Sequence, residues 1–179
     1  MELYEKTLNE EYAFKGKIIN LRVDSVELPD GAKASREIVE HNGGICVLPI
    51  DDDMNTYVVK QWRAPYREVV TEIPAGKRDG KEKPLEGGKR ELKEEIGAVA
   101  REYINLGELY PSPGYCGEII YMYMAKGLTF EGQDLDEDEF LNVVKMPFED
   151  LVKMVMNGEI KDAKTIAAVL KADKILKDL

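Results

Sequence analysis

The sequence predicts a helix with well-defined ends between Pro84 and Gly97. Proline is tolerated in the first helical turn, where its missing N–H would have no partner, and glycine is favoured just past the last turn. Between these ends, Leu85, Leu92 and Ile96 recur at helical spacing and form one apolar stripe. We therefore expect a helix from Pro84 to Ile96 that packs this stripe on a core.

Three glutamates lie beside the apolar stripe. Glu91 and Glu95 are four residues apart and hence neighbours on the helix surface, and Glu94 lies one step further round. Two carboxylates this close repel each other unless a cation lies between them, and Mg²⁺ favours a few carboxylates together with water and phosphate oxygens. The pattern is typical of a metal-binding helix, and a solvated amphipathic helix with Glu–Lys ion pairs is the alternative.

The spacing upstream favours the metal-binding interpretation. Gly76 is followed after five residues by Glu82, and after seven more by Arg90-Glu91-Leu92, then Glu94-Glu95, Gly97 and Ala98. This spacing resembles the Nudix box, Gx5Ex7REUxEExGU, in which U is apolar. By chance, such a match would occur on the order of once in ten million starting points. The resemblance implies a hydrolase that cleaves a nucleoside diphosphate linked to another group, with Arg90 and Glu82 holding the loop and the helix together.

The composition narrows the class of partner. The formal net charge is −10 and no cluster of Lys and Arg is present, whereas binding of duplex nucleic acid needs a concentrated positive surface. No apolar run is long enough to span a membrane, and the N-terminal MELYEKTLNEEY carries acids where a signal peptide would be apolar. Cys46 and Cys116 lack metal-ligand spacing and make no disulfide framework. We expect a cytoplasmic protein without nucleic-acid or membrane partners, in which the lone His41 ends a strand.

Alternating apolar residues and turn signals outline the remaining elements. A turn at Pro29-Asp30-Gly31 separates the expected strands 17–28 and 35–41, which predicts an N-terminal hairpin. Further strands are expected at 44–50, 56–62, 68–73, 103–110, 118–125 and 140–146, and helices at 147–157 and 162–176. The fold class is α+β, an α/β/α sandwich, and the layout resembles the Nudix fold with an N-terminal β-hairpin extension. The resemblance implies that residues 1–42 form a hairpin region that serves as a dimerisation element, and that residues 43–179 form the Nudix hydrolase domain.

A turn after the box narrows the resemblance within the family. The run from Tyr110 to Gly114 reads YPSPG, and Pro113 lies fifteen residues past the end of the box. This spacing resembles that of ADP-ribose pyrophosphatases, and Glu118 follows at their spacing. The resemblance implies substrate-binding roles for Ser112, Gly114 and Glu118. Without the distance from the box, an ordinary β-turn would be the favoured interpretation.

Residues upstream of the box also resemble that family. The segment KQWRAP, from Lys60 to Pro65, resembles its Gln-aromatic-Arg segment and implies that Arg63 contacts the diphosphate. By the same resemblance, Arg36 reaches the adenine bound in the other subunit, and Glu72 contacts substrate. For each of these residues an ion pair on a strand surface is the alternative.

An acidic loop lies before the last expected strand. The run from Gln133 to Leu141 reads QDLDEDEFL, and similar proteins carry a Glu-x-Glu that matches Glu137 and Glu139. The resemblance implies that Glu137 is the general base and Glu139 an outer metal ligand. Which acid of residues 136–139 is the base stays open at this point, and a merely solvated loop is the alternative.

Together these features imply hydrolysis of ADP-ribose to AMP and ribose 5-phosphate by a Mg²⁺-dependent homodimer, with Mn²⁺ as a substitute metal. Glu91, Glu95 and Glu137 would be the catalytic residues. The metal ligands would be the carbonyl of Ala75 and the carboxylates of Glu91, Glu94, Glu95 and Glu139. One alternative is a Nudix hydrolase of another nucleoside diphosphate derivative, such as a GDP-sugar or a dinucleotide. The other is a non-catalytic nucleotide-sensing module, which degraded box acids would indicate, whereas all are intact here.

Overall fold

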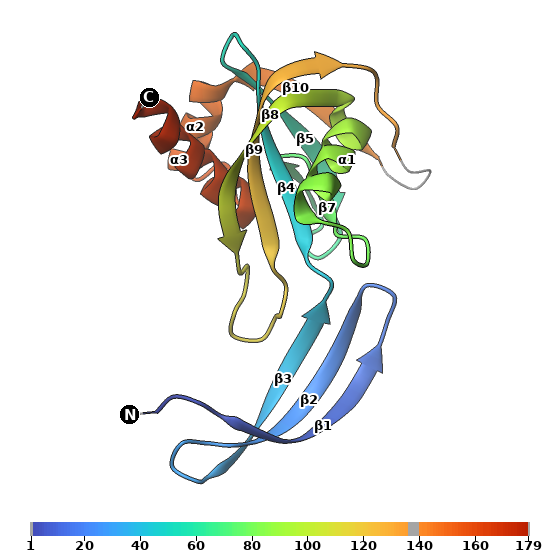
Figure 1. Ribbon diagram of the computed structural model, residues 1–179, viewed down its shortest axis with the longest axis vertical. Helices are drawn as coiled ribbons and strands as arrows, with labels where there is room; N and C mark the ends of the chain where they lie inside the picture. The colour runs from blue at the N-terminus through green and yellow to red at the C-terminus, as the bar shows by residue number, and fades with distance from the viewer. Residues whose placement is uncertain (1, 136–139, 179) are drawn as a thin grey trace. The chain divides into compact units, whose positions relative to one another are not determined.

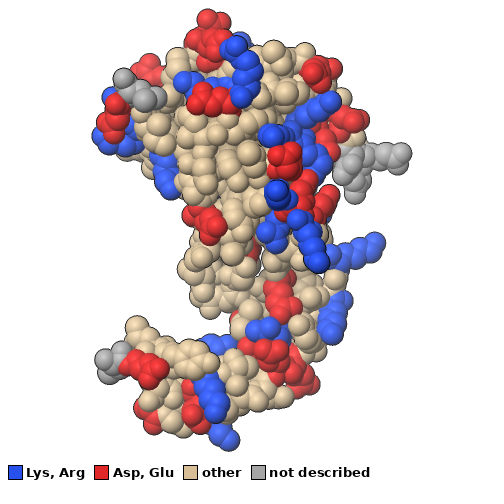
Figure 2. Space-filling model, in the orientation of Figure 1, with Lys and Arg blue, Asp and Glu red and all other residues tan. Residues whose placement is uncertain are grey.

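The computed structural model describes residues 2–135 and 140–178, and the chain forms two compact units. The first unit contains the residues up to Gly43 together with Tyr110–Ile119, and the second contains Gly44–Leu109 together with the residues from Ile120 onward. Among the described residues, none of the helices is both long and apolar enough to cross a membrane. On the face shown in Figure 2, basic and acidic side chains are intermixed.

The first unit is built on a three-stranded antiparallel sheet in the order β1-β2-β3 (Figure 1). Its strands are β1 (Lys6–Lys15), β2 (Ile19–Glu27) and β3 (Lys33–His41). The predicted hairpin is the β2–β3 pair, which turns through Gly31 at a φ of 85°. The predicted hairpin is therefore confirmed, and β1 adds a third strand that was not predicted. All ten residues of β1 are exposed, so the strand has no buried face of the kind that a sequence pattern can reveal.

The segment Tyr110–Ile119 is hydrogen-bonded to the last strand of this sheet. The N–H of Val39 donates to the carbonyl of Tyr115 at 2.8 Å, and the N–H of Gly117 donates to the carbonyl of Val39 at 2.9 Å. Both backbone groups of Val39 are thereby satisfied, which fixes the segment along β3.

The second unit contains a seven-stranded mixed sheet in the order β10-β5-β4-β9-β8, in which β6 also pairs with β5 and β7 with β4. The strands are β4 (Gly44–Ile50), β5 (Asn55–Arg63), β6 (Glu68–Glu72), β7 (Ala75–Lys77), β8 (Ala98–Leu109), β9 (Ile120–Phe130) and β10 (Leu141–Pro147). The β4–β9 pair is parallel and the other pairs are antiparallel.

Helices cover both faces of this sheet, so the predicted α/β/α sandwich is confirmed (Figure 1). Helix α1 (Pro84–Ile96) covers one face, and α2 (Phe148–Met156) and α3 (Ala163–Lys177) cover the other. Strand β4 is buried along its whole length and alternates between two cores. Leu48 faces the core beneath α2 and α3, whereas Val47 packs with Leu92 of α1.

The predicted ends of α1 are confirmed. The helix begins at Pro84 and ends at Ile96, and Gly97 follows in the left-handed conformation with a φ of 67°. The other predicted elements are present with ends shifted by a few residues, except that β8 begins at Ala98 and the short β7 was not predicted. Strand β7 has three residues, too few for any sequence period to show.

Candidate active site

Two buried carboxylates of α1 meet the strand β7. The N–H of Ala75 donates a hydrogen bond to Oε2 of Glu95 at 2.9 Å, and Glu95 is only 1% exposed. Glu91 lies one turn earlier and is 8% exposed. A Cβ on Gly76 would lie 1.9 Å from Oε1 of Glu91, so only glycine lets this carboxylate lie against the strand. The helix therefore presents both carboxylates to the Ala75–Gly76 backbone.

Two further glycines bring the helix close to the sheet. A Cβ on Gly87 would lie 2.9 Å from Cδ1 of Ile45, and a Cβ on Gly88 would lie 3.1 Å from Cγ2 of Val47. Glycine in a helix interior costs about 1 kcal/mol relative to alanine. That cost is offset by the close packing of α1 on β4, which sets how far the carboxylates reach toward β7.

Arg90 joins the box loop to the helix. Its Nη1 donates to Oε1 of Glu91 at 2.7 Å and to Oε2 of Glu94 at 2.8 Å. Its Nη2 donates to the carbonyl of Lys77 and, together with Nε, contacts the carboxylate of Glu82. The bond from Arg90 is the main cause that lowers the pKa of Glu82 below its ordinary value. The contacts of Arg90 and Glu82 thus connect the loop that precedes α1 to the helix itself.

The donors at this position suit a hard divalent cation. Among residues 2–135 and 140–178, no three His, Cys, Asp or Glu side chains form a ready-made metal cluster. Mg²⁺ needs only one or two carboxylates, because water and substrate phosphate complete its octahedron. The carboxylates of Glu91, Glu94 and Glu95 and the carbonyl of Ala75 offer oxygen donors alone, and the absence of a side chain at Gly76 lets the Glu91 carboxylate lie beside the backbone. This donor set fits Mg²⁺.

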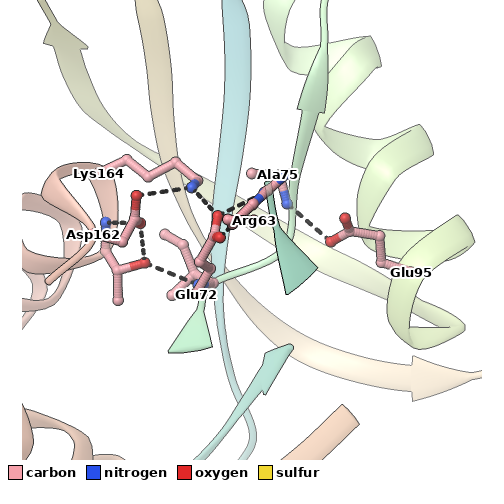
Figure 3. A network of polar contacts seen from close by, with 8 residues as sticks. Arg63, Glu72, Ala75, Glu95, Asp162 and Lys164 are labelled. Atoms are coloured by element: carbon pink, nitrogen blue, oxygen red, sulfur yellow. Dashed lines mark hydrogen bonds and ion pairs between the residues drawn. The ribbon is translucent and has the colours of Figure 1, made fainter. Parts of the chain in front are cut away.

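A second polar network begins at the neighbouring strands β5 and β6 (Figure 3). Arg63 forms a bidentate pair with Glu72, in which Nε and Nη2 donate to the two carboxylate oxygens at 2.6 and 2.7 Å. Lys164 of α3 donates to Oε2 of the same carboxylate and to Oδ1 of Asp162, the latter at 3.0 Å. The ion pair named as the alternative for Arg63 and Glu72 is therefore present, and their contacts with substrate stay predictions.

The charge state of Glu72 follows from these partners. Burial raises the pKa of its carboxyl, but the bonds from Arg63 and Lys164 outweigh burial and lower the pKa below its ordinary value. Glu72 is therefore ionised although it is only 2% exposed.

Sequence reasoning missed the contribution of α3 to this network. Asp162 caps the helix by accepting the N–H of Thr165 at 3.0 Å, and the hydroxyl of Thr165 accepts the N–H of Ile73 at 2.9 Å. The cap could have been recognised from an aspartate three residues before a threonine at the start of a helix. The contact with Ile73 spans 92 positions, and no local pattern marks it.

The remaining described candidates lie in the first unit. Arg36 forms a bidentate pair with Glu5 at 2.9 and 2.6 Å. Glu118 lies in the loop before β9 rather than in the strand predicted to begin there, and its Oε1 lies 3.2 Å from Nδ1 of His41, the last residue of β3. The carbonyl of Ser112 accepts the N–H groups of Tyr115 and Cys116.

The substrate-binding roles predicted for Arg36, Ser112, Gly114 and Glu118 stay predictions. A Cβ on Gly114 would meet nothing within 4 Å, so no steric need for glycine is evident there. Glu137 and Glu139, predicted as base and metal ligand, lie outside the described residues.

Comparisons with known proteins agree with this geometry. The model of the nucleoside diphosphate sugar hydrolase N-terminal domain matches residues 5–39, and that of the NUDIX domain matches residues 40–169. The chain is 42% identical over 169 residues to an ADP-ribose pyrophosphatase of Bacillus subtilis (strain 168), covering 93% of this chain and 91% of that protein. It is 38% identical over 167 residues to a methanol dehydrogenase activator of Bacillus methanolicus, covering 92% and 90%.

More distant similarity extends to a second specificity and to a solved structure. A GDP-mannose pyrophosphatase of Yersinia pestis (strain Pestoides F) is 32% identical over 141 residues, which cover 73% of this chain and 71% of that protein. The crystal structure of an ADP compounds hydrolase superposes with a TM-score of 0.87 at 21% identity, covering 99% of this chain and 97% of the other.

Proposed function

The chain belongs to the Nudix family, and from that membership we propose that it hydrolyses ADP-ribose to AMP and ribose 5-phosphate. The observation that carries the proposal is the pair of buried carboxylates, Glu91 and Glu95, held against the backbone of Ala75 and Gly76. The relative named as an ADP-ribose pyrophosphatase supports this choice of substrate within the family.

The metal of this reaction is proposed to be Mg²⁺, with Mn²⁺ as a substitute. Glu91, Glu94, Glu95, the carbonyl of Ala75 and, beyond the described residues, Glu139 would hold it. When bound, Mg²⁺ supplies Lewis acidity toward the diphosphate oxygens and water. Glu95 already accepts a hydrogen bond from Ala75, so its carboxylate is oriented by the strand before any ligand arrives.

Two side chains would act directly on the reactants. Arg63 would bind the diphosphate, because a guanidinium offers paired donors to phosphate oxygens and carries a permanent positive charge. Glu137 would accept the proton from the water whose oxygen attacks phosphorus, while the second phosphate leaves with the electrons of the broken P–O bond. Arg63 would also neutralise charge that develops on the phosphate oxygens.

We also propose that the chain acts as a homodimer, with residues 1–42 as the dimerisation element and residues 43–179 as the hydrolase domain. Arg36 would reach the adenine bound in the partner subunit, exchanging its pairing with Glu5 for that contact. Ser112, Gly114, Glu118 and Glu72 are proposed as further substrate contacts. A cytoplasmic location stays a prediction from the sequence, with which the two free cysteines, Cys46 and Cys116, agree.

Another nucleoside diphosphate derivative is the second candidate substrate, because a relative is named as a GDP-mannose pyrophosphatase. The purified protein should be assayed with ADP-ribose, GDP-mannose, NADH and diadenosine polyphosphates, with and without Mg²⁺. We expect the highest kcat/KM for ADP-ribose, and only with the metal. A higher value for GDP-mannose or a dinucleotide would support the second candidate. Tight binding without turnover of any compound would indicate a sensing module.

A further inference from the structure

The carboxylate of Glu72 is held by two cations that come from different elements. Arg63 approaches from β5 and Lys164 from α3, and the side chain of Glu72 between them is only 3% exposed (Figure 3). One cation is enough to neutralise one carboxylate, so the second requires an explanation. The family resemblance implies a role for Arg63 but none for Lys164.

The two cations differ in how much of them faces solvent. The side chain of Arg63 is 38% exposed and that of Lys164 is 11% exposed. Arg63 uses Nε and Nη2 for Glu72, and its Nη1 has no hydrogen-bond partner in the part of the chain that the structure describes. Arg63 can therefore donate to a ligand while its other edge stays on Glu72, whereas Lys164 is enclosed.

Lys164 is itself fixed in place by the start of α3. Asp162 accepts hydrogen bonds from Lys164, from the N–H of Thr165 and from its hydroxyl, at 3.0, 3.0 and 2.6 Å. Burial lowers the pKa of Lys164, but Asp162 and Glu72 outweigh it and raise the pKa above its ordinary value, so Lys164 is charged. The capped helix end thus presents a fixed positive charge to Glu72.

The charges of these four groups sum to zero. Arg63 and Lys164 carry two positive charges, and Glu72 and Asp162 carry two negative charges. Without Lys164, Arg63 would be the only cation left to compensate the buried Glu72 among its partners in residues 2–135 and 140–178. Glu72 would then draw on the positive charge of Arg63 alone, and less of that charge would be available to a dianionic diphosphate.

We propose that Lys164 is a positioning residue for the diphosphate: it neutralises Glu72, so that the positive charge of Arg63 is available to the substrate. The proposal rests on the proposed function, because the diphosphate that Arg63 would bind is that of ADP-ribose. The competing explanation is that Lys164 only fastens α3 to the sheet, in which case its loss would lower stability and leave binding unchanged.

The test is binding of the non-hydrolysable α,β-methylene analogue of ADP-ribose, measured by calorimetry in EDTA. Lys164→Met should weaken binding at least about tenfold, which is about 1.4 kcal/mol. Lys161→Met is the matched control, because Lys161 pairs with Glu68 on the same strand as Glu72 but is 69% exposed. The control should bind as wild type does.

A double-mutant cycle separates positioning from fastening. Once Glu72→Gln has removed the carboxylate, Lys164 has nothing to neutralise for Arg63. Adding Lys164→Met to that variant should therefore weaken binding less than about threefold. An equal loss in both backgrounds would overturn the proposal, as would Lys164→Met binding like the Lys161→Met control.

Folding and function must be scored beside binding. If Lys164→Met does not fold, Lys164→Gln keeps a hydrogen-bonding side chain without the charge; failure of both to fold would make Lys164 a structural residue and end the proposal. Wild-type turnover of ADP-ribose is measured in parallel. If the wild type hydrolyses ADP-ribose but the loss of Lys164 does not change binding, only this inference is wrong. If the wild type neither binds nor hydrolyses ADP-ribose, the proposed function is wrong as well.

Discussion

The backbone N–H of Ala75 donates to Oε2 of Glu95 at 2.9 Å, although the two residues are 20 positions apart in the chain. This bond ties the strand that carries one proposed metal ligand, the carbonyl of Ala75, to the helix that carries another, the carboxylate of Glu95. The strand and the helix are thereby fixed to each other at the atoms that the proposed chemistry uses.

Gly76 is predicted to be essential because of the space it leaves. In Gly76→Ala the added Cβ would lie 1.9 Å from Oε1 of Glu91, so the carboxylate must move away from the strand. We expect kcat to fall about a hundredfold or more and the Mg²⁺ concentration for half-activity to rise. Gly117→Ala is the control, because its Cβ would make an ordinary contact at 3.6 Å with the carbonyl of Val39. Equal activity of the two variants would contradict the assignment of Glu91.

The ends of α1 could be predicted because they depend on local chemistry. Pro84 and Gly97 each favour one helix terminus by their own backbone properties, and the structure places the ends there. Strand β1 was not predicted, because all of its residues are exposed and it has no buried face; it forms by pairing with β2. Local sequence describes an element well when the element's own residues stabilise it.

The same distinction applies to the candidate site. Glu91, Glu94 and Glu95 follow one another on a single helix, so their spacing in the sequence already grouped them. The contact of Lys164 with Glu72 joins residues 92 positions apart and exists only after α3 has packed on the sheet. Long-range pairs of this kind form only in the folded chain, which explains why the sequence did not reveal Lys164 as the second cation that contacts Glu72.

The acidic loop at residues 136–139 requires two variants to assign its roles. Glu137→Gln should lower kcat and leave the Mg²⁺ requirement unchanged, because a base carries the proton and does not hold the metal. Glu139→Gln should raise the Mg²⁺ concentration for half-activity, because it removes a ligand. The reverse pattern would exchange the two assignments, and unchanged activity in both would place the base elsewhere.

Arg36 tests the proposed composite site. In Arg36→Ala we expect a higher KM for ADP-ribose and a nearly unchanged kcat, because adenine lies far from the reacting phosphorus. Mixing Arg36→Ala with Glu95→Gln subunits that exchange should restore some sites with neither defect, and activity with the wild-type KM should reappear. A mixture that only averages its parents, or a protein that sediments as a monomer, would refute the shared site.

Asp51 provides a test of stability against pH. Burial raises the pKa of its carboxyl, but hydrogen bonds from Lys145, Asn55 and Tyr57 outweigh it and lower the pKa from 3.8 to about 2. Because the folded-state pKa is the lower one, the carboxylate stabilises the fold fully above about pH 4, and this stabilisation is lost as the pH falls toward 2. Unfolding of wild type and Asp51→Asn should therefore differ at pH 6 and converge near pH 2. A difference in unfolding free energy that does not change with pH would contradict this account.

The rate of ADP-ribose hydrolysis by wild type and by Glu95→Gln, with the products quantified, tests the central claim most directly. Glutamine keeps the shape of the side chain and an oxygen that can accept the N–H of Ala75, but it removes the charge of a proposed metal ligand. We predict equal amounts of AMP and ribose 5-phosphate from wild type, formed only with Mg²⁺. The kcat of a folded Glu95→Gln should be at least about a thousandfold lower. A wild type that leaves ADP-ribose intact, or a Glu95→Gln variant with unaltered turnover at saturating Mg²⁺, would contradict the account.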